Sequence, residues 1–140
     1  MASMAAAQSA QRVTALEVSR AVITAAMKVH STLGPGLLES AYEACLAHEL
    51  SKAGYRVECQ VPLPVVYDGI KLDLGYRIDM LVEDLVVVEI KAVEAINPVH
   101  HAQIISYLKL SRRSLGLLMN FHVAHLKEGI KRFVSGRNWK

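Results

Sequence analysis

The sequence has few cysteines, no long apolar run and no internal repeat, and these absences narrow the class of protein. Its 140 residues include only Cys45 and Cys59, without C-x-x-C spacing, so we expect reduced, buried thiols, with a single disulfide as the open alternative. No apolar run approaches the roughly 18 residues that a membrane-spanning helix needs. The N-terminus also lacks the hydrophobic region of a secretory signal. We therefore expect a cytoplasmic protein that does not contact membranes.

Length and composition predict a single folded domain. Hydrophobic residues make up 52% of the chain and charged residues 21%, proportions that are typical of globular proteins. A chain of 140 residues can bury most of the surface that it exposes when unfolded. We expect a disordered N-terminal segment over residues 1–13, one domain over residues 14–135, and a frayed tail over residues 136–140.

Positive charge gathers in the last part of the chain. Residues 1–108 contain 8 Lys and Arg against 12 Asp and Glu, whereas residues 109–140 contain 8 Lys and Arg against a single Glu. This asymmetry favours a surface that faces a polyanion, and a solubilising C-terminal face is the alternative. If that polyanion is a nucleic acid, the contacts that we expect to its backbone are Lys109, Arg112, Arg113, Lys127, Lys131 and Arg132, together with Tyr107, two residues before Lys109 on the same predicted helix.

The most informative stretch runs from Asp79 to Lys91. It reads as a β-hairpin, in which a strand is followed by a tight polar turn at Glu83-Asp84 and then by an apolar strand. The hairpin brings Asp79 back to the level of Glu89, and Glu89 and Lys91 share a face because side chains alternate along a strand. An ionised group in an apolar strand is costly unless it is paired or bound to a metal. The alternative is a solvated strand end with a weak ion pair.

The remaining patterns predict the element order ααβββαβα. Two helices are followed by an antiparallel meander of three strands, a crossover helix, a fourth strand parallel to the third, and a final amphipathic helix. Helices should cover both faces of this mixed α/β sheet, because the third strand is hydrophobic throughout. The predicted helices span residues 14–33, 38–52, 98–110 and 123–134, and the predicted strands span residues 55–66, 70–82, 85–91 and 115–120.

Two of the predicted helices carry further polar candidates. Glu39 lies in the first turn of the second helix, where the helix dipole favours a carboxylate, and taken alone it reads as an ordinary N-terminal helix acid. Gln103 and Tyr107 are four residues apart and are therefore neighbours on the surface of the crossover helix. We expect His30 to be a packed or capping histidine rather than a ligand.

The ordered set of motifs resembles the PD-(D/E)xK nuclease superfamily. That superfamily has an acid on a preceding helix, then Asp-x9-Glu-x-Lys across a β-hairpin, then a helix that carries Gln. Within it, Gly36-x-x-Glu39-x-x-Tyr42 resembles the G-x-x-E-x-x-Y signature of a family of small bacterial proteins. The similarity extends over residues 14–135 and includes Val29-His30, Gln60-Val61-Pro62-Leu63-Pro64, Gln103-Ile-Ile-Ser-Tyr107 and Gly116-Leu-Leu-Met-Asn120-Phe121.

The resemblance implies a restriction-endonuclease-like fold and a metal-dependent phosphodiesterase site. Asp79 and Glu89 match the metal-binding acids, Lys91 matches the lysine, Glu39 matches the helix acid, and Gln103 matches the polar residue of the following helix. Carboxylate and carbonyl oxygens suit Mg²⁺ or Mn²⁺. The expected ligands are therefore the side chains of Asp79, Glu89 and Glu39 and the backbone carbonyl of Ile90, with Lys91 assisting the attacking water.

Two functions from different classes remain open at this point. The first is a Mg²⁺- or Mn²⁺-dependent nuclease that hydrolyses phosphodiester bonds of nucleic acid, with DNA favoured over RNA. The second is a non-catalytic nuclease-fold module that binds nucleic acid or protein in a larger assembly. The small size favours the second, because 140 residues leave little room for substrate recognition. A homodimer would make up that shortage by presenting two sites to a duplex.

Overall fold

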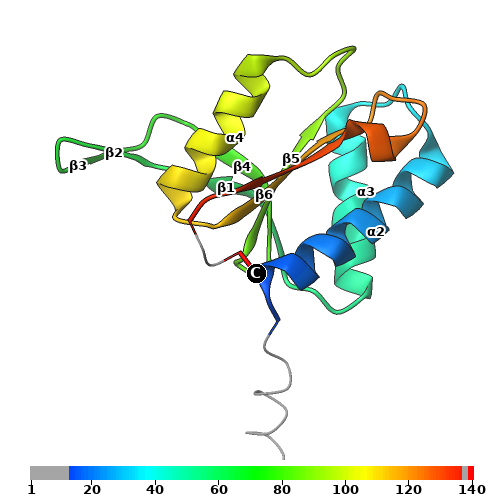
Figure 1. Ribbon diagram of the computed structural model, residues 1–140, viewed down its shortest axis with the longest axis horizontal. Coiled ribbons are helices and arrows are strands. Elements are labelled where there is room, and N and C mark those ends of the chain that lie inside the picture. The colour runs from blue at the N-terminus through cyan, green and yellow to red at the C-terminus, as the bar shows by residue number, and fades with distance from the viewer. Residues whose placement is uncertain (1–12, 137–138) are drawn as a thin grey trace, which may run out of the picture.

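The protein forms three layers, with one mixed β-sheet between two layers of helices (Figure 1). This computed structural model describes residues 13–136 and 139–140, so residues 1–12 of the predicted N-terminal segment and residues 137–138 of the predicted tail lie outside the described residues. One face of the sheet carries α2 (Ala15–Leu33) and α3 (Glu39–Lys52), and the other carries α4 (Pro98–Ser111). Within the described ranges, no helix is both long and apolar enough to cross a bilayer.

The sheet has five strands in the spatial order β1-β4-β5-β6-β7. Only β5 and β6 run parallel, and the other neighbours are antiparallel. This arrangement confirms the predicted fold class, a restriction-endonuclease-like meander followed by a parallel strand. The strands are β1 (Val57–Pro62), β4 (Arg77–Val82), β5 (Val86–Lys91), β6 (Leu115–Asn120) and β7 (Ile130–Val134).

The final helix predicted over residues 123–134 is wrong. That segment holds a short 3₁₀ helix, η1 (Leu126–Gly129), and then strand β7, which pairs with β6. Ile130 packs on the α2–α3 side of the sheet and Phe133 on the α4 side, whereas a helix would place both on one face. A Cβ at Gly129 would collide with the carbonyl oxygen of Asn120, so only glycine permits this approach of β7 to β6.

Two of the predicted strands are interrupted, and a separate small hairpin lies between them. Strand β1 ends at Pro62, and β2 (Val65–Tyr67) pairs with β3 (Ile70–Leu72) around Asp68-Gly69, both of which have positive φ. This hairpin projects from the rest of the fold (Figure 1). The turn at Glu83-Asp84 confirms the main predicted hairpin, and both turn residues have positive φ, as a tight turn between twisted strands requires.

Helix starts lie where the sequence patterns place them. Thr14 accepts a hydrogen bond from the backbone N–H of Glu17 at 3.1 Å and completes a capping box at α2. Asn97 caps α4, with Pro98 in its first turn. Both cysteines are free, as expected, but Cys59 is exposed and Cys45 half-buried, so the expectation of buried thiols is wrong for Cys59.

Strand β5 contributes to two hydrophobic cores. Val86, Val88 and Ile90 face the core beneath α2 and α3, whereas Val87 faces the core beneath α4. Alternation along the strand therefore directs Glu89, like Val87, towards α4. Helix α4 packs closely against β6, since a Cβ at Gly116 would lie 3.0 Å from Cδ1 of Ile104.

Candidate functional site

The pairing of β4 with β5 opens at Asp79 and Glu89. The ladder between the two strands ends with the pair Met80–Val88. Beyond that pair, the backbone N–H of Asp79 donates to Oε2 of Glu89 at 3.1 Å. The N–H of Ile90 donates to Oδ2 of Asp79 at 2.9 Å. Each carboxylate therefore accepts from the backbone of the opposite strand, and both acids lie where the strands separate.

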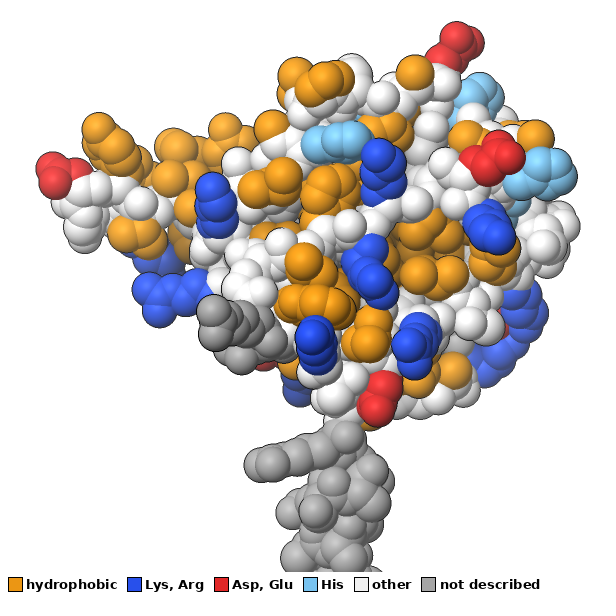
Figure 2. All heavy atoms as spheres, in the orientation of Figure 1, with side chains coloured by type: hydrophobic (Ala, Val, Ile, Leu, Met, Phe, Trp, Pro, Cys, Tyr) orange, Lys and Arg blue, Asp and Glu red, His pale blue; other side chains and the backbone are white. Residues whose placement is uncertain are grey.

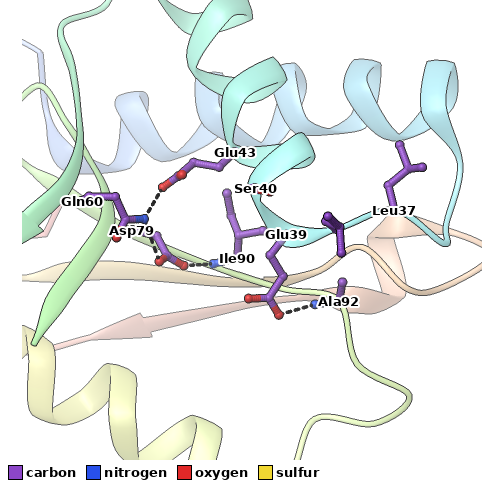
Figure 3. Close-up of a pocket in the computed structure, with 9 residues that line it drawn as sticks. Leu37, Glu39, Ser40, Glu43, Gln60, Asp79, Ile90 and Ala92 are labelled. Carbon is purple, nitrogen blue, oxygen red and sulfur yellow. Dashed lines mark hydrogen bonds between the residues drawn. The ribbon is translucent and has the colours of Figure 1, made fainter.

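Glu39 accepts a hydrogen bond from the same unpaired edge of β5, two residues further along the chain. Its Oε2 accepts the backbone N–H of Ala92 at 2.9 Å. N–H groups of alternate residues point to the same edge of a strand, about 7 Å apart, so Ile90 and Ala92 present theirs to the edge that β4 has left. Asp79 accepts the N–H of Ile90 and Glu39 accepts the N–H of Ala92 (Figure 3). The carbonyl of Ile90 points to the edge that its N–H faces.

Tyr42 stabilises the loop that leads into α3, whose first residue is Glu39. Its hydroxyl donates to the carbonyl of Gly34 at 2.6 Å and accepts the N–H of Leu37 at 3.1 Å. The ring is fully buried and stacks on Phe121, with ring centroids 4.5 Å apart. Tyr42 therefore supports the site through the loop before α3 and does not line the cleft.

Glu89 is a buried acid beside a second acid. Its side chain is 3% exposed. Burial raises the pKa of Glu89 to about 9, and the neighbouring carboxylate of Asp79 adds to the rise, while Lys91 opposes it. Without a compensating cation this carboxyl therefore holds its proton at neutral pH.

The residues at this opening fit a hard divalent cation, although they do not form a complete cage. In residues 13–136 and 139–140, no group of three or more His, Cys, Asp or Glu side chains could by itself hold a metal ion. Mg²⁺ needs only one or two protein carboxylates, because water and substrate phosphate fill its other positions. Asp79, Glu89 and the carbonyl of Ile90 supply oxygen donors, and a cation would offset the cost of the buried carboxylate pair.

Lys91 lines a cavity of about 550 Å³ on the α4 side of the sheet. Gln103, Tyr107 and Tyr76 line the same cavity. Nε2 of Gln103 donates to the Tyr107 hydroxyl at 3.3 Å. The pKa of Tyr107 is raised, first by burial and then by the charge of Glu89. The structure thus brings three of the predicted residues, Lys91, Gln103 and Tyr107, into one cavity next to Glu89.

On the other side of residues 90–92 lies a cleft of about 550 Å³ that contains two polar residues missed by the sequence interpretation (Figure 3). Glu43 lies four residues after Glu39 and therefore on the same face of α3, a spacing that could have identified it. Gln60 lies on β1, and its Nε2 donates to Oε1 of Glu43 at 2.8 Å and to Oδ1 of Asp79 at 3.4 Å. Burial raises the pKa of Glu43, and the Gln60 hydrogen bond opposes that rise.

The predicted nucleic-acid contacts are dispersed. Lys109, Arg112 and Arg113 lie at the C-terminal end of α4, and Arg113 pairs with Asp84 in the β4–β5 turn, at the end of β5 opposite to Lys91. The other three lie on η1 and β7, outside the α4 cavity. On the face shown in Figure 2, Lys and Arg side chains are separated by hydrophobic ones. Of the seven expected contacts, only Tyr107 lies beside the acids; those on η1 and β7 are Lys127, Lys131 and Arg132.

His30 is a packed histidine, as expected. It is 7% exposed, and its Nε2 donates to the carbonyl oxygen of Val123 at 2.9 Å. This bond ties the end of α2 to the loop before η1.

The comparisons with known proteins agree with this architecture. A family model described as the PD-(D/E)XK nuclease superfamily matches residues 16–133. The matched range runs from α2 to β7 and contains every residue predicted for catalysis or metal binding. Searches of curated proteins and of solved structures gave no match.

Proposed function

The chain belongs to the PD-(D/E)XK nuclease superfamily, and from that premise we propose that it is a divalent-metal-dependent nuclease that hydrolyses phosphodiester bonds, with DNA favoured over RNA. One observation carries the proposal. Asp79 and Glu89 exchange hydrogen bonds with each other's strand where β4 leaves β5, and Lys91 follows on the same face as Glu89. Two acids and a lysine thus lie together where the two strands separate, beside the buried centre of the sheet.

Nucleases of this superfamily generally use divalent metals. A bound Mg²⁺ or Mn²⁺ supplies a Lewis acid for the phosphate and lowers the pKa of coordinated water. Asp79, Glu89 and the Ile90 carbonyl would hold the ion. Glu39, which already accepts the N–H of Ala92, has a second carboxylate oxygen for a further ion or a metal-bound water.

The remaining residues act on the substrate from the α4 side. The ammonium of Lys91 orients the attacking water and stabilises the negative charge that grows on the phosphate. Gln103 and Tyr107 offer amide and hydroxyl donors to phosphate or water in the same cavity. The half-buried position of Lys91 supports this role, since a charge screened from water acts more strongly.

Within the superfamily, we place the chain with the small bacterial proteins that carry the G-x-x-E-x-x-Y signature. The geometry gives these residues a common purpose. Gly36 has a φ of 103°, which glycine adopts readily, and Tyr42 closes the loop over Gly34 and Leu37. Both residues position Glu39 at the edge of β5.

The dispersed basic side chains favour a second candidate, a non-catalytic binding module in a larger assembly. A site without its own phosphate-binding surface needs a partner or a second copy to hold nucleic acid. Against this candidate, the ion pairs among the described residues leave Asp79, Glu89 and Glu39 without an Arg or Lys partner. No basic side chain therefore neutralises the acids in place of a metal ion, which supports the nuclease function over the binding module.

Purified protein tests the proposal directly. We expect Mg²⁺- or Mn²⁺-dependent cleavage of at least one substrate among duplex DNA, single-stranded DNA, branched DNA and RNA. Asp79→Ala and Lys91→Ala should abolish it while circular dichroism shows an intact fold. Glu58→Ala and Lys71→Ala, at exposed positions on β1 and β3, are matched controls that should cleave normally. Undiminished cleavage in the site variants contradicts the proposal.

A further inference from the structure

Gln60 has a backbone conformation that is unusual inside a strand. Its φ is +54°, in the left-handed region of backbone conformation that residues other than Gly, Asn and Asp rarely adopt. The register of β1 with β4 nevertheless continues on both sides, with Cys59 opposite Met80 and Val61 opposite Ile78. Gln60 therefore lies opposite Asp79, and its conformation cannot be explained by an inserted residue.

The conformation places the Gln60 amide between two carboxylates. Nε2 donates to Oε1 of Glu43 at 2.8 Å and to Oδ1 of Asp79 at 3.4 Å, as Figure 3 shows. The orientation of the amide follows from these neighbours, because both are acceptors and only the NH₂ end can donate. One side chain thus links α3, β1 and β4 at the cleft.

This bridge restrains the Asp79 carboxylate. Oδ2 accepts from the N–H of Ile90 at 2.9 Å, and Oδ1 accepts a longer hydrogen bond from Gln60 at 3.4 Å, so each oxygen of the carboxylate has a protein donor. A carboxylate has about four lone-pair positions, which leaves positions open for a cation. The same amide donates to both Asp79 and Glu43, which offsets part of the repulsion between their like charges.

We propose that Gln60 is a positioning residue that holds Asp79 in the orientation needed to bind a divalent metal, and that its strained backbone is kept for this purpose. The inference rests on the proposed function, because it assigns Asp79 to a metal ligand. Gln60 does not touch the reacting atoms. Groups that hydrogen-bond to a metal ligand typically contribute 10-fold to 100-fold to metal affinity, which is the effect we assign to Gln60.

Two substitutions distinguish the effect of the Gln60 side-chain amide from the effect of its strained backbone. Gln60→Gly removes the side chain and relieves the strain, because glycine adopts positive φ freely. Gln60→Met removes the amide, keeps most of the side-chain length, and retains the strain. Glu58→Gly is the matched control, since Glu58 is exposed on the same strand and has no positive φ.

Mn²⁺ binding by calorimetry and thermal unfolding, both without nucleic acid, are the measurements. We expect both Gln60 variants to bind Mn²⁺ about 10-fold to 100-fold more weakly than the wild type, and Glu58→Gly to bind it normally. Gln60→Gly should unfold at the wild-type temperature or above, whereas Glu58→Gly should unfold roughly 2–4 °C lower.

Wild-type Mn²⁺ affinity in both Gln60 variants overturns the inference, and so does a wild-type protein that binds no Mn²⁺. Equal destabilisation by Gln60→Gly and Glu58→Gly overturns the claim of strain. A wild type whose Mn²⁺ affinity depends on Gln60 but which cleaves no nucleic acid contradicts the proposed function and leaves the inference standing.

Discussion

Asp79 and Glu89 bind across the opening between β4 and β5, since the backbone N–H of Asp79 donates to Glu89 and the Asp79 carboxylate accepts the N–H that follows Glu89. Each acid therefore both replaces a lost ladder bond and faces the other acid. Two carboxylates so close cannot easily ionise together in a buried site. The stability of the fold and the proposed activity both depend on what compensates their charge.

The metal-free protein should lose stability as the pH rises from about 5 to 9. The pKa of Glu89 is raised to about 9 in the folded state from an ordinary value of 4.5. Between these values the unfolded chain releases a proton that the folded protein keeps, so each pH unit favours unfolding by up to about 1.4 kcal/mol. Urea unfolding in a chelator across this pH range measures the slope.

Glu89→Gln is the control for that slope, because it keeps the volume of the side chain without an ionisable group. The stability of this variant should depend less on pH. At pH 8, Mn²⁺ should increase the unfolding free energy of the wild type but not that of the variant. Parallel pH profiles for the two proteins contradict the assignment of the slope to Glu89.

Tyr42→Phe should lower the cleavage rate although Tyr42 does not line the cleft. The substitution removes one hydroxyl that binds both Gly34 and Leu37 and leaves the ring stacked on Phe121. We expect a loss of about 1 kcal/mol in unfolding free energy and a fall in cleavage rate, because Glu39 loses its fixed approach to Ala92. Tyr55→Phe, at a half-buried position just after α3, is a matched control. Equal cleavage by Tyr42→Phe and the wild type contradicts the role given to this loop.

Local patterns predicted the β4–β5 hairpin because alternation and turn chemistry are encoded within a dozen residues. The contact of Glu39 with Ala92 spans 53 positions. The family resemblance assigned Glu39 to the same site as the hairpin residues, but nothing in the sequence indicated this contact. Gln60 was missed as a site residue because its importance depends on the register of β1 with β4, which spacing along the chain does not encode. Glu43 could have been found, since it lies one turn after Glu39.

The wrong helix over residues 123–134 and the wide spacing of the basic residues both have causes that lie far apart in the sequence. The segment at residues 123–134 has apolar residues at helical spacing, but β6 needed a partner at its free edge, and pairing with β6 outweighed helix propensity. The basic residues were grouped because they are close in the sequence. The fold separates them, since α4 lies on one face of the sheet and β7 forms its edge.

Lys91→Met should separate metal binding from catalysis. Lys91 lies on the α4 side with Gln103 and Tyr107, while Asp79 and the Ile90 carbonyl keep their places at the free edge of β5. We expect cleavage to fall at least 100-fold, as for other lost groups that stabilise charge in a transition state. Mn²⁺ affinity should not decrease, because a nearby positive charge has been removed. Loss of Mn²⁺ binding together with cleavage contradicts a role for Lys91 confined to chemistry.

Arg113 and Lys131 should behave differently, although the sequence assigned both to nucleic-acid binding. Arg113 pairs with Asp84 and donates to the carbonyl of Ser111 at 3.2 Å, so Arg113→Ala should lower the unfolding temperature and leave nucleic-acid affinity unchanged. Lys131 is exposed on β7, and Lys131→Ala should weaken binding and reduce the salt dependence by about one phosphate contact. Titrations at several salt concentrations measure both effects. A salt slope that falls equally in the two variants would show that Arg113 also contacts the backbone, and would restore it to the nucleic-acid surface.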